Sequence, residues 1–218
     1  MLNKSPIRRW IILGIATLLL LFFGYLWQLN SQVVRAFSTP PSADDITYQQ
    51  QSKVAMNMLL LVEDQSYFQH SGVDFKEIVR VLRDYLLYDK PLRGASTITQ
   101  QLVKNTLLSR ERTLSRKTKE ILMALLLEHS FDKEFILSRY MNHVYLGQNG
   151  AQAIRGFHQA AVFYFHKPLD QLSLKQMATL VALVKGPSYY HPVKYPQRLA
   201  KRRQLVLRLY QQHKKIVK

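Results

Sequence analysis

The sequence contains no cysteine, so the 218-residue chain has neither a disulfide framework nor a thiolate metal site. Its seven histidines lack the spacing of metal ligands, and no H-E-x-x-H motif is present. The absence of cysteine fits any cell compartment. It does exclude the classes of protein that depend on thiol chemistry.

Acidic residues are also scarce, with 14 aspartates and glutamates against 31 lysines and arginines, a formal net charge of +17. Such a surplus predicts an anionic partner, which can be nucleic acid, anionic lipid or a pyrophosphate substrate. The charge alone does not choose among these three.

One segment, Trp10–Leu29, contains no charged side chain. At 1.5 Å per residue, a helix of that length spans the roughly 30 Å hydrocarbon core of a bilayer. Aromatic residues near its ends suit the membrane interface, and the basic residues before it predict a cytoplasmic N-terminus. A cleaved signal peptide is the alternative. We favour a retained anchor because the run is long for a signal peptide and no clear A-x-A site follows it.

The remaining sequence shows helical periodicity, with no convincing strand and no internal repeat, and predicts an all-α domain. Ser173 and Gln176 form a capping box before one helix, and Gly186-Pro187 ends it. A polar stretch with Pro40-Pro41, residues 31–52, reads as a tether. The expected helices are 53–63, 75–88, a polar helix after Gly94, 116–128, 132–142, 151–165, 174–185 and 197–212.

The segment Gly94–Asn105 is too polar for a core helix. Ser96 or Thr97 can cap its start, while Ile98 and Leu102 lie one turn apart on an apolar face. A second stripe combines hydroxyl, amide and ammonium groups, namely Thr97, Gln101, Lys104 and Asn105. Such a stripe suits a sugar or a phosphate. A capped and solvated helix is the alternative.

Basic residues cluster directly after this stripe, with six of them within sixteen positions and Glu111 as the acid among them. A solvated face is the usual explanation for such a run. Next to the polar stripe, however, a cradle for pyrophosphate is favoured, because arginine binds phosphate in bidentate fashion and lysine adds a point charge. The six are Lys104, Arg110, Arg112, Arg116, Lys117 and Lys119.

Two carboxylates are candidates for catalysis. Glu63 follows an apolar run at the expected end of a helix, where burial and the helix dipole both disfavour its charged form, as suits a general base. Glu120 follows Arg116 and Lys117 on one helix face, the poorer order of charges for helix stability. A pyrophosphate site explains this arrangement better than a surface ion pair does.

Five ordered segments together resemble the peptidoglycan glycosyltransferases, the domain that polymerises lipid II. They are Glu63–Asp74, Gly94–Asn105, Arg116–Glu120, Ile136–Asn142 and Tyr145–Gly150. The resemblance covers roughly residues 54–210, and details around 148–157 look like the 1b-type bifunctional penicillin-binding proteins. Tyr67 and Met141 depart mildly from the family pattern, which usually has Phe and Leu at these positions.

The resemblance implies a lysozyme-like fold with Glu63 and Glu120 as catalytic residues and a structural role for His70. It also implies a divalent cation, Mg²⁺ or Mn²⁺, held near Glu120 through pyrophosphate, and no organic cofactor. The substrate-binding residues that it implies are Asp64, Thr97, Gln100, Gln101, Lys104, Asn105, Arg116 and Lys117. Of these, Asp64 is expected to support Glu63, and the hydroxyl and amide side chains are expected to bind substrate oxygens or to order the groove.

The implied reaction joins a sugar hydroxyl of one lipid-linked unit to C1 of another and expels a lipid pyrophosphate. Its partners would be lipid II, the growing glycan chain, membrane lipids and cell-wall synthesis or division proteins, with no nucleic acid. A lysozyme-like hydrolase and a non-catalytic scaffold are the alternatives. A nucleic-acid binder fits poorly, because aromatic interleaving is missing and the predicted topology places the domain outside the cytoplasm.

The expected organisation is a cytoplasmic tail at 1–9, a membrane helix at 10–29 and a tether at 30–52. A glycosyltransferase domain at 53–212 and a basic tail at 213–218 follow. The protein is thus expected to cross the inner membrane once, with its catalytic domain on the periplasmic side. The segment 75–92 carries enough apolar surface to touch the bilayer, although it could instead pack into the core.

Overall fold

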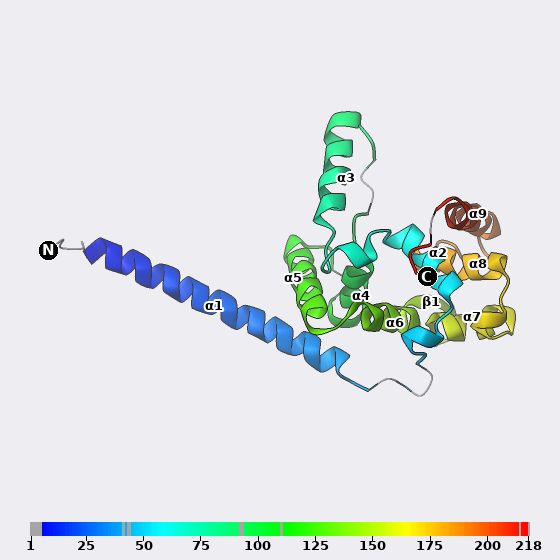
Figure 1. The fold of residues 1–218 in the computed structure, drawn as a ribbon, viewed down its shortest axis with the longest axis horizontal. Helices are drawn as coiled ribbons and strands as arrows, with labels where there is room; N and C mark the ends of the chain where they lie inside the picture. The colour runs from blue at the N-terminus through cyan, green and yellow to red at the C-terminus, as the bar shows by residue number, and fades with distance from the viewer. Residues whose placement is uncertain are drawn as a thin grey trace.

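A long N-terminal helix, α1 (Pro6–Phe37), leads into a body of shorter helices (Figure 1). The computed structural model describes residues 6–40, 42, 45–91, 94–109, 111–213 and 215–217. One helix in this part of the chain, over Arg8–Phe37, is long and apolar enough to cross a membrane. Arg110, one of the six expected cradle residues, lies outside the described residues.

The body is mainly helical, as predicted. Its helices are α2 (Lys53–Glu63), α3 (Phe75–Tyr88), α4 (Ile98–Leu107), α5 (Leu114–Ser130), α6 (Lys133–His143), α7 (Phe157–Phe165), α8 (Leu174–Val184) and α9 (Pro196–Gln212). Short 3₁₀ turns, η1 (Tyr48–Gln50), η2 (Tyr67–Gln69) and η3 (Leu169–Gln171), join some of them. The predicted bounds of α2 and α3 are confirmed, and the capping box of Ser173 and Gln176 begins α8.

A β-hairpin corrects the expectation that no strand is present. Strand β1 (Tyr145–Asn149) pairs antiparallel with β2 (Gln152–Arg155), so that Asn149 lies opposite Gln152. The predicted helix over 151–165 is therefore wrong in its first part, and α7 begins only after Gly156. Both strands are short and alternate poorly between apolar and polar residues, so the period-2 signal of a strand is weak.

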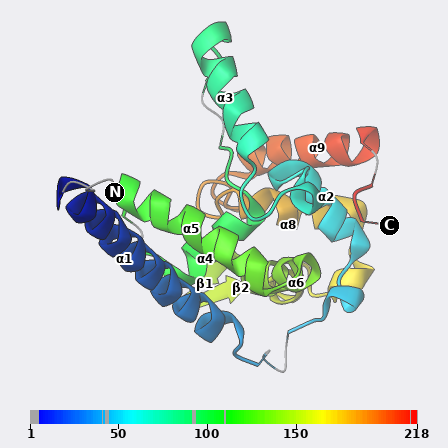
Figure 2. The same cartoon turned by 60° about the vertical axis from the view of Figure 1, so that its left-hand side comes forward.

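The expected tether is also wrong in its first part, because α1 continues through it to Phe37. Leu29, Val33 and Phe37 recur every four residues, are almost fully buried, and belong to the core. This end of α1 packs against α5 (Figures 1 and 2). The ring of Phe37 meets that of Phe131 edge-on. The polar composition of 31–52 concealed this apolar stripe.

Residues on α6 then hold the chain that follows α1. Arg139 donates to Asp45 at 3.0 Å, and Ser138 and Asn142 donate to the carbonyl oxygen of Ile46 at 2.8 and 2.9 Å. The segment between α1 and α2 is therefore fastened to the body and does not behave as a free linker.

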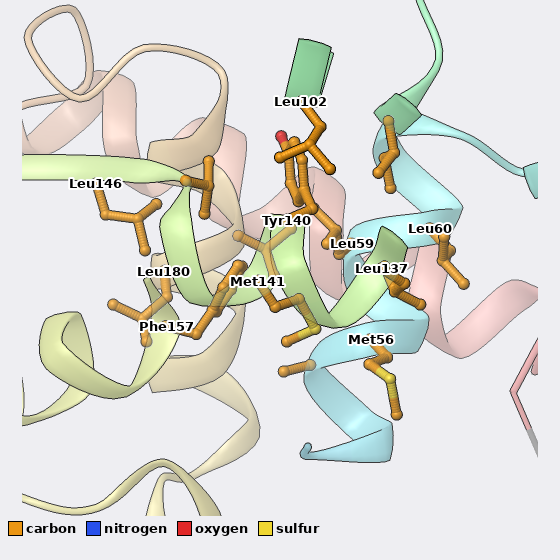
Figure 3. Close-up of a cluster of buried hydrophobic side chains, with 14 of the residues drawn as sticks. Met56, Leu59, Leu60, Leu102, Leu137, Tyr140, Met141, Leu146, Phe157 and Leu180 are labelled. Atoms are coloured by element: carbon orange, nitrogen blue, oxygen red, sulfur yellow. The ribbon is translucent and has the colours of Figure 1, made fainter. Parts of the chain in front are cut away.

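The core is centred on α2, where every residue from Ala55 to Leu61 is buried. Figure 3 shows Leu59 and Leu60 of α2 in one cluster with Leu137 and Met141 of α6. The helix is enclosed on nearly all sides. A helix that is apolar all round is a buried helix.

By contrast, α3 has no buried residue and stands away from the body in both views (Figures 1 and 2). Its exposed large apolar residues are Phe75, Val79, Leu82, Tyr85, Leu86, Leu87 and Tyr88. The alternative that they pack into the core is therefore wrong.

We predict that Gly156→Ala destabilises the domain by about 2–3 kcal/mol. Gly156 has φ +76° and ψ 155°, a backbone region that is almost restricted to glycine, and a Cβ there would lie 2.3 Å from the carbonyl oxygen of Asn142. Gly150→Ala is the control, since its φ is +56° but its Cβ would meet open space, and it should cost only about 1 kcal/mol. Denaturant unfolding in detergent measures both, and equal losses would contradict the steric argument.

Candidate active site

A cleft of about 990 Å³ opens beside the C-terminal end of α2. Its walls come from α2, α4, the start of α5, α6, the hairpin and the end of α8. The predicted site residues among its lining are Glu63, Gln101, Lys104, Asn105 and Arg116. Residues from motifs that are far apart in the sequence therefore line one cleft.

Glu63 is the last residue of α2, and its side chain is only 7% exposed. One carboxylate oxygen accepts from Gln101 Nε2 of α4 at 3.2 Å. The other accepts from an Arg202 guanidinium nitrogen of α9 at 3.1 Å. The carboxylate thus enters the cleft wall with one neutral and one cationic donor.

A buried tyrosine fixes the orientation of Gln101. The hydroxyl of Tyr140 on α6 donates to Gln101 Oε1 at 2.7 Å, so the amide nitrogen of Gln101 must face Glu63. Burial raises the pKa of Tyr140 well above its ordinary value, and the charges of Glu63 and Asp64 add to the rise. The hydroxyl therefore remains a donor at any physiological pH.

The sequence argument for Glu63 considered burial and the helix dipole but missed Arg202. The basic character of the last helix was visible in the sequence, but periodicity identifies the apolar face of a helix and not the target of an inward-pointing arginine. Tyr140 was visible only as part of a motif.

Glu120 is 2% exposed and does not line the cleft. Arg116 contacts one of its carboxylate oxygens at 2.7 Å, and Lys117 contacts the other. Lys117 also donates to Ser96 at 3.0 Å, which ties α5 to the segment before α4. Glu120 is therefore held by Arg116 and Lys117, and Arg116 is the member of this group that lines the cleft.

A protein-held cation does not fit this arrangement. Both oxygens of Glu120 are neutralised by basic side chains, and the described residues contain no group of three or more histidine or acidic side chains that could hold a metal. A cation bound here would need most of its ligands from the substrate.

The cationic wall comprises Lys104, Arg112 and Arg116, with Glu111 among them. The Nε of Arg116 is buried without a hydrogen-bond partner among the described residues. Of the other expected cradle residues, Lys119 lies outside the cleft lining. Arg155 of β2 and Lys185 after α8 add positive charge elsewhere in the lining, and the sequence analysis did not single them out.

Three predicted substrate-binding residues order the groove from inside. Asp64 accepts from the backbone N–H of Ile98 at 2.9 Å and contacts His70 at 3.0 Å. Thr97 accepts from the N–H of Gln100 at 3.1 Å, and Gln100 accepts from the N–H of Thr97 at 3.1 Å. These polar groups are buried and already hydrogen-bonded, so the structure does not place them in direct contact with substrate.

His70 lies in a buried network that includes Asp64, Glu128 and Lys133. The His70 and Asp64 side chains are 6% and 3% exposed, and Lys133 contacts Glu128 at 2.7 Å. Burial lowers the pKa of Lys133, while Glu128 opposes that change. Tyr67 donates to the carbonyl oxygen of Lys133 at 2.8 Å. The hydroxyl that distinguishes this tyrosine from the family's usual phenylalanine therefore has a partner.

The arrangement places a carboxylate base beside a wall of positive charge in one cleft. A base of this kind can remove a proton from a sugar hydroxyl, and the cations can stabilise a departing phosphate.

Comparisons with known proteins agree with the family resemblance drawn from the sequence motifs. The family model described as "Transglycosylase" matches residues 30–211. Penicillin-binding protein 1B of Haemophilus influenzae is 45% identical over 171 residues, which cover 78% of this chain and 22% of that protein. The corresponding proteins of Vibrio cholerae and Escherichia coli are 47% and 41% identical over 161 and 192 residues, or 74% and 87% of this chain and 21% and 23% of theirs.

The chain thus spans between a fifth and a quarter of the length of these relatives. The matched region begins at residue 30, where α1 starts to pack on the body. These matches confirm the resemblance drawn from the motifs, and the chain belongs to the transglycosylase family.

Proposed function

We propose that the chain polymerises lipid II into glycan strands by glycosyl transfer, with release of a lipid pyrophosphate. The observation that carries the proposal is the presence of Glu63 and a cationic wall in one cleft. Its decisive test is turnover of labelled lipid II by the purified chain, measured with and without a divalent cation.

In this reaction the 4-hydroxyl oxygen of the acceptor sugar attacks C1 of the donor. The new bond joins C1 to that oxygen, and the bond between C1 and the phosphate oxygen breaks. Glu63 takes the hydroxyl proton, and the electron pair leaves with the pyrophosphate. Lys104, Arg112 and Arg116 line the cleft and supply the positive charge that this leaving group needs.

The cationic wall favours transfer over the hydrolase alternative. A hydrolase of finished glycan has no pyrophosphate leaving group and needs no such wall beside its acid and base. The scaffold alternative gives no reason for a buried carboxylate in a polar cleft. We therefore retain both only as outcomes of the turnover test.

We also propose a single-pass protein of the inner membrane, with its N-terminus inside and its catalytic domain outside. The unbroken helix from Pro6 to Phe37, whose last turns are buried in the domain, supports a retained anchor. Lipid II, the growing glycan and membrane lipids are the proposed partners. Cell-wall synthesis or division proteins are further proposed partners, and the divalent cation is proposed only as a companion of the substrate.

We predict that Glu63→Gln lowers polymerisation at least ~100-fold, because the amide cannot accept the proton. The measurement is turnover of labelled lipid II, with thermal unfolding to show that the fold persists. Glu111→Gln is the matched control, since Glu111 lines the same cleft without touching Glu63, and it should retain most activity. Near-wild-type turnover by Glu63→Gln would contradict the assignment of the base.

We predict that Lys104→Ala and Arg116→Ala each weaken binding of a phosphoglycolipid inhibitor by about 10-fold or more, because each removes a charged donor to phosphate. Titration calorimetry in detergent measures the affinity. Lys119→Ala is the control, since Lys119 lies on α5 outside the cleft lining. If both cleft variants bound the inhibitor normally, the cradle would have to lie elsewhere.

We predict that α3 inserts into the bilayer surface. Its apolar residues are exposed, with Leu86 at 66% and Leu87 at 70%, and Arg80, Arg83 and Lys90 can meet anionic headgroups. The test is co-sedimentation with anionic vesicles of a chain that begins at Leu29, which keeps the buried end of α1.

In that chain, Leu86→Asp with Leu87→Asp should reduce vesicle binding about 10-fold or more, because two charges would have to enter apolar lipid. Leu174→Asp is the control, since Leu174 is exposed at the start of α8. Unchanged binding by the double variant would remove α3 from the membrane contact.

A further inference from the structure

A single arginine on the last helix, Arg202, pairs with Glu63 across 139 positions of sequence. Helix α9 packs against both α8 and α2, and Glu63 is the last residue of α2. Arg202 therefore reaches the C-terminal end of α2 from a neighbouring helix. A cation there also complements the negative end of the helix dipole.

The pair is enclosed, with side-chain exposures of 16% for Arg202 and 7% for Glu63. Removing charges from water is costly unless each has a partner, so a carboxylate at this depth needs a charged or hydrogen-bonding group beside it. Arg202 supplies a charged partner to the proposed base.

Stability alone accounts poorly for the pair. The Nε of Arg202 is buried without a hydrogen-bond partner among the described residues, which is unfavourable for a polar group. Buried ion pairs are also weak contributors to stability, because desolvation offsets much of their attraction. An arginine placed here at such cost is better explained by what it does to Glu63.

The two donors on Glu63 have different effects. Gln101, oriented by Tyr140, is a neutral donor to one carboxylate oxygen, whereas Arg202 is a charged donor to the other. Each carboxylate oxygen accepts one of these bonds and keeps a second lone pair for a substrate hydroxyl. The donors thus hold the carboxylate still without blocking it.

Other charged and titratable groups near Glu63 come from several elements. Asp64 follows it on the chain and is paired with His70, and Tyr140 faces it from α6. Lys104, Arg116 and Lys185 line the same cleft. Within the described part of the chain, the ion pair of Glu63 is with Arg202.

We propose that Arg202 is a positioning residue that holds the Glu63 carboxylate and directs it into the cleft for proton transfer. The proposal rests on the polymerase function proposed above. Arg202 touches the base and not the reacting sugar, so its effect should appear in kcat and not in KM.

The test is the steady-state kinetics of lipid II polymerisation. Arg202→Ala should lower kcat about 10-fold or more with little change in KM, because the base is no longer held in place while the substrate contacts remain. Arg202→Lys, which keeps a cationic donor, should restore part of the lost kcat. Arg208→Ala is the matched control, because Arg208 is an exposed arginine on the same helix.

A merely structural arginine would give a different result. Arg202→Ala would then lower the melting temperature and the amount of active protein while kcat per active enzyme stayed at its wild-type value, and that outcome overturns the proposal. Wild-type kinetics for Arg202→Ala also overturn it. Inhibitor binding to the cationic wall should be unchanged in Arg202→Ala, because that wall lies on α4, on α5 and in the segment between them.

A second measurement does not depend on activity. Melting temperatures of Arg202→Ala, Glu63→Gln and the double variant form a cycle, and the double variant should lose less than the sum of the single losses. Additive losses would show that the two side chains are uncoupled and would contradict the proposal. A wild-type chain that fails to polymerise lipid II would contradict the proposed function, whereas this cycle tests the pairing by itself.

Discussion

Enclosure of α2 is the constraint on which the rest of the structure depends. The helix is buried along most of its length, and α8 and α9 pack against it. Its apolar burial ends at Val62, and the next residue, Glu63, enters the cleft. The rigid core therefore sets the position of the proposed base, and the elements around α2 deliver the groups that contact it.

Buried carboxylates in and around the site are each balanced by a basic partner. Glu63 pairs with Arg202, Glu120 with Arg116 and Lys117, and Glu128 with Lys133. Charged groups in a poorly solvated interior need such compensation. Because these acidic residues are already paired inside the domain, the basic residues in excess remain available to the cleft wall and the surface. The overall charge of +17 thus has a structural counterpart.

Attachment of the body to α1 follows from packing rather than from a loose connection. The end of α1 is buried against α5, and α6 holds the segment that follows. Because α5 also carries Arg116, the helix that reaches the cleft is the same helix that receives the anchor. The cleft and the anchor are consequently held in a fixed relation.

Much of the fold was readable from local patterns. The bounds of α2 and α3, the capping box of α8 and the ordered motifs depend on neighbours within a few residues. Three features were not readable in this way. The hairpin has weak alternation, the stripe at the end of α1 is diluted by polar residues, and Thr97 and Gln100 face inward to cap a helix.

By itself, the sequence determined the helical domain and its family, and it pointed to Glu63 and the cationic residues as candidates for the site. Only the tertiary structure paired Glu63 with Arg202 and oriented Gln101 through Tyr140, because these contacts arise from the packing of α9, α4 and α6 around α2, and no local pattern records which distant helix a side chain will meet.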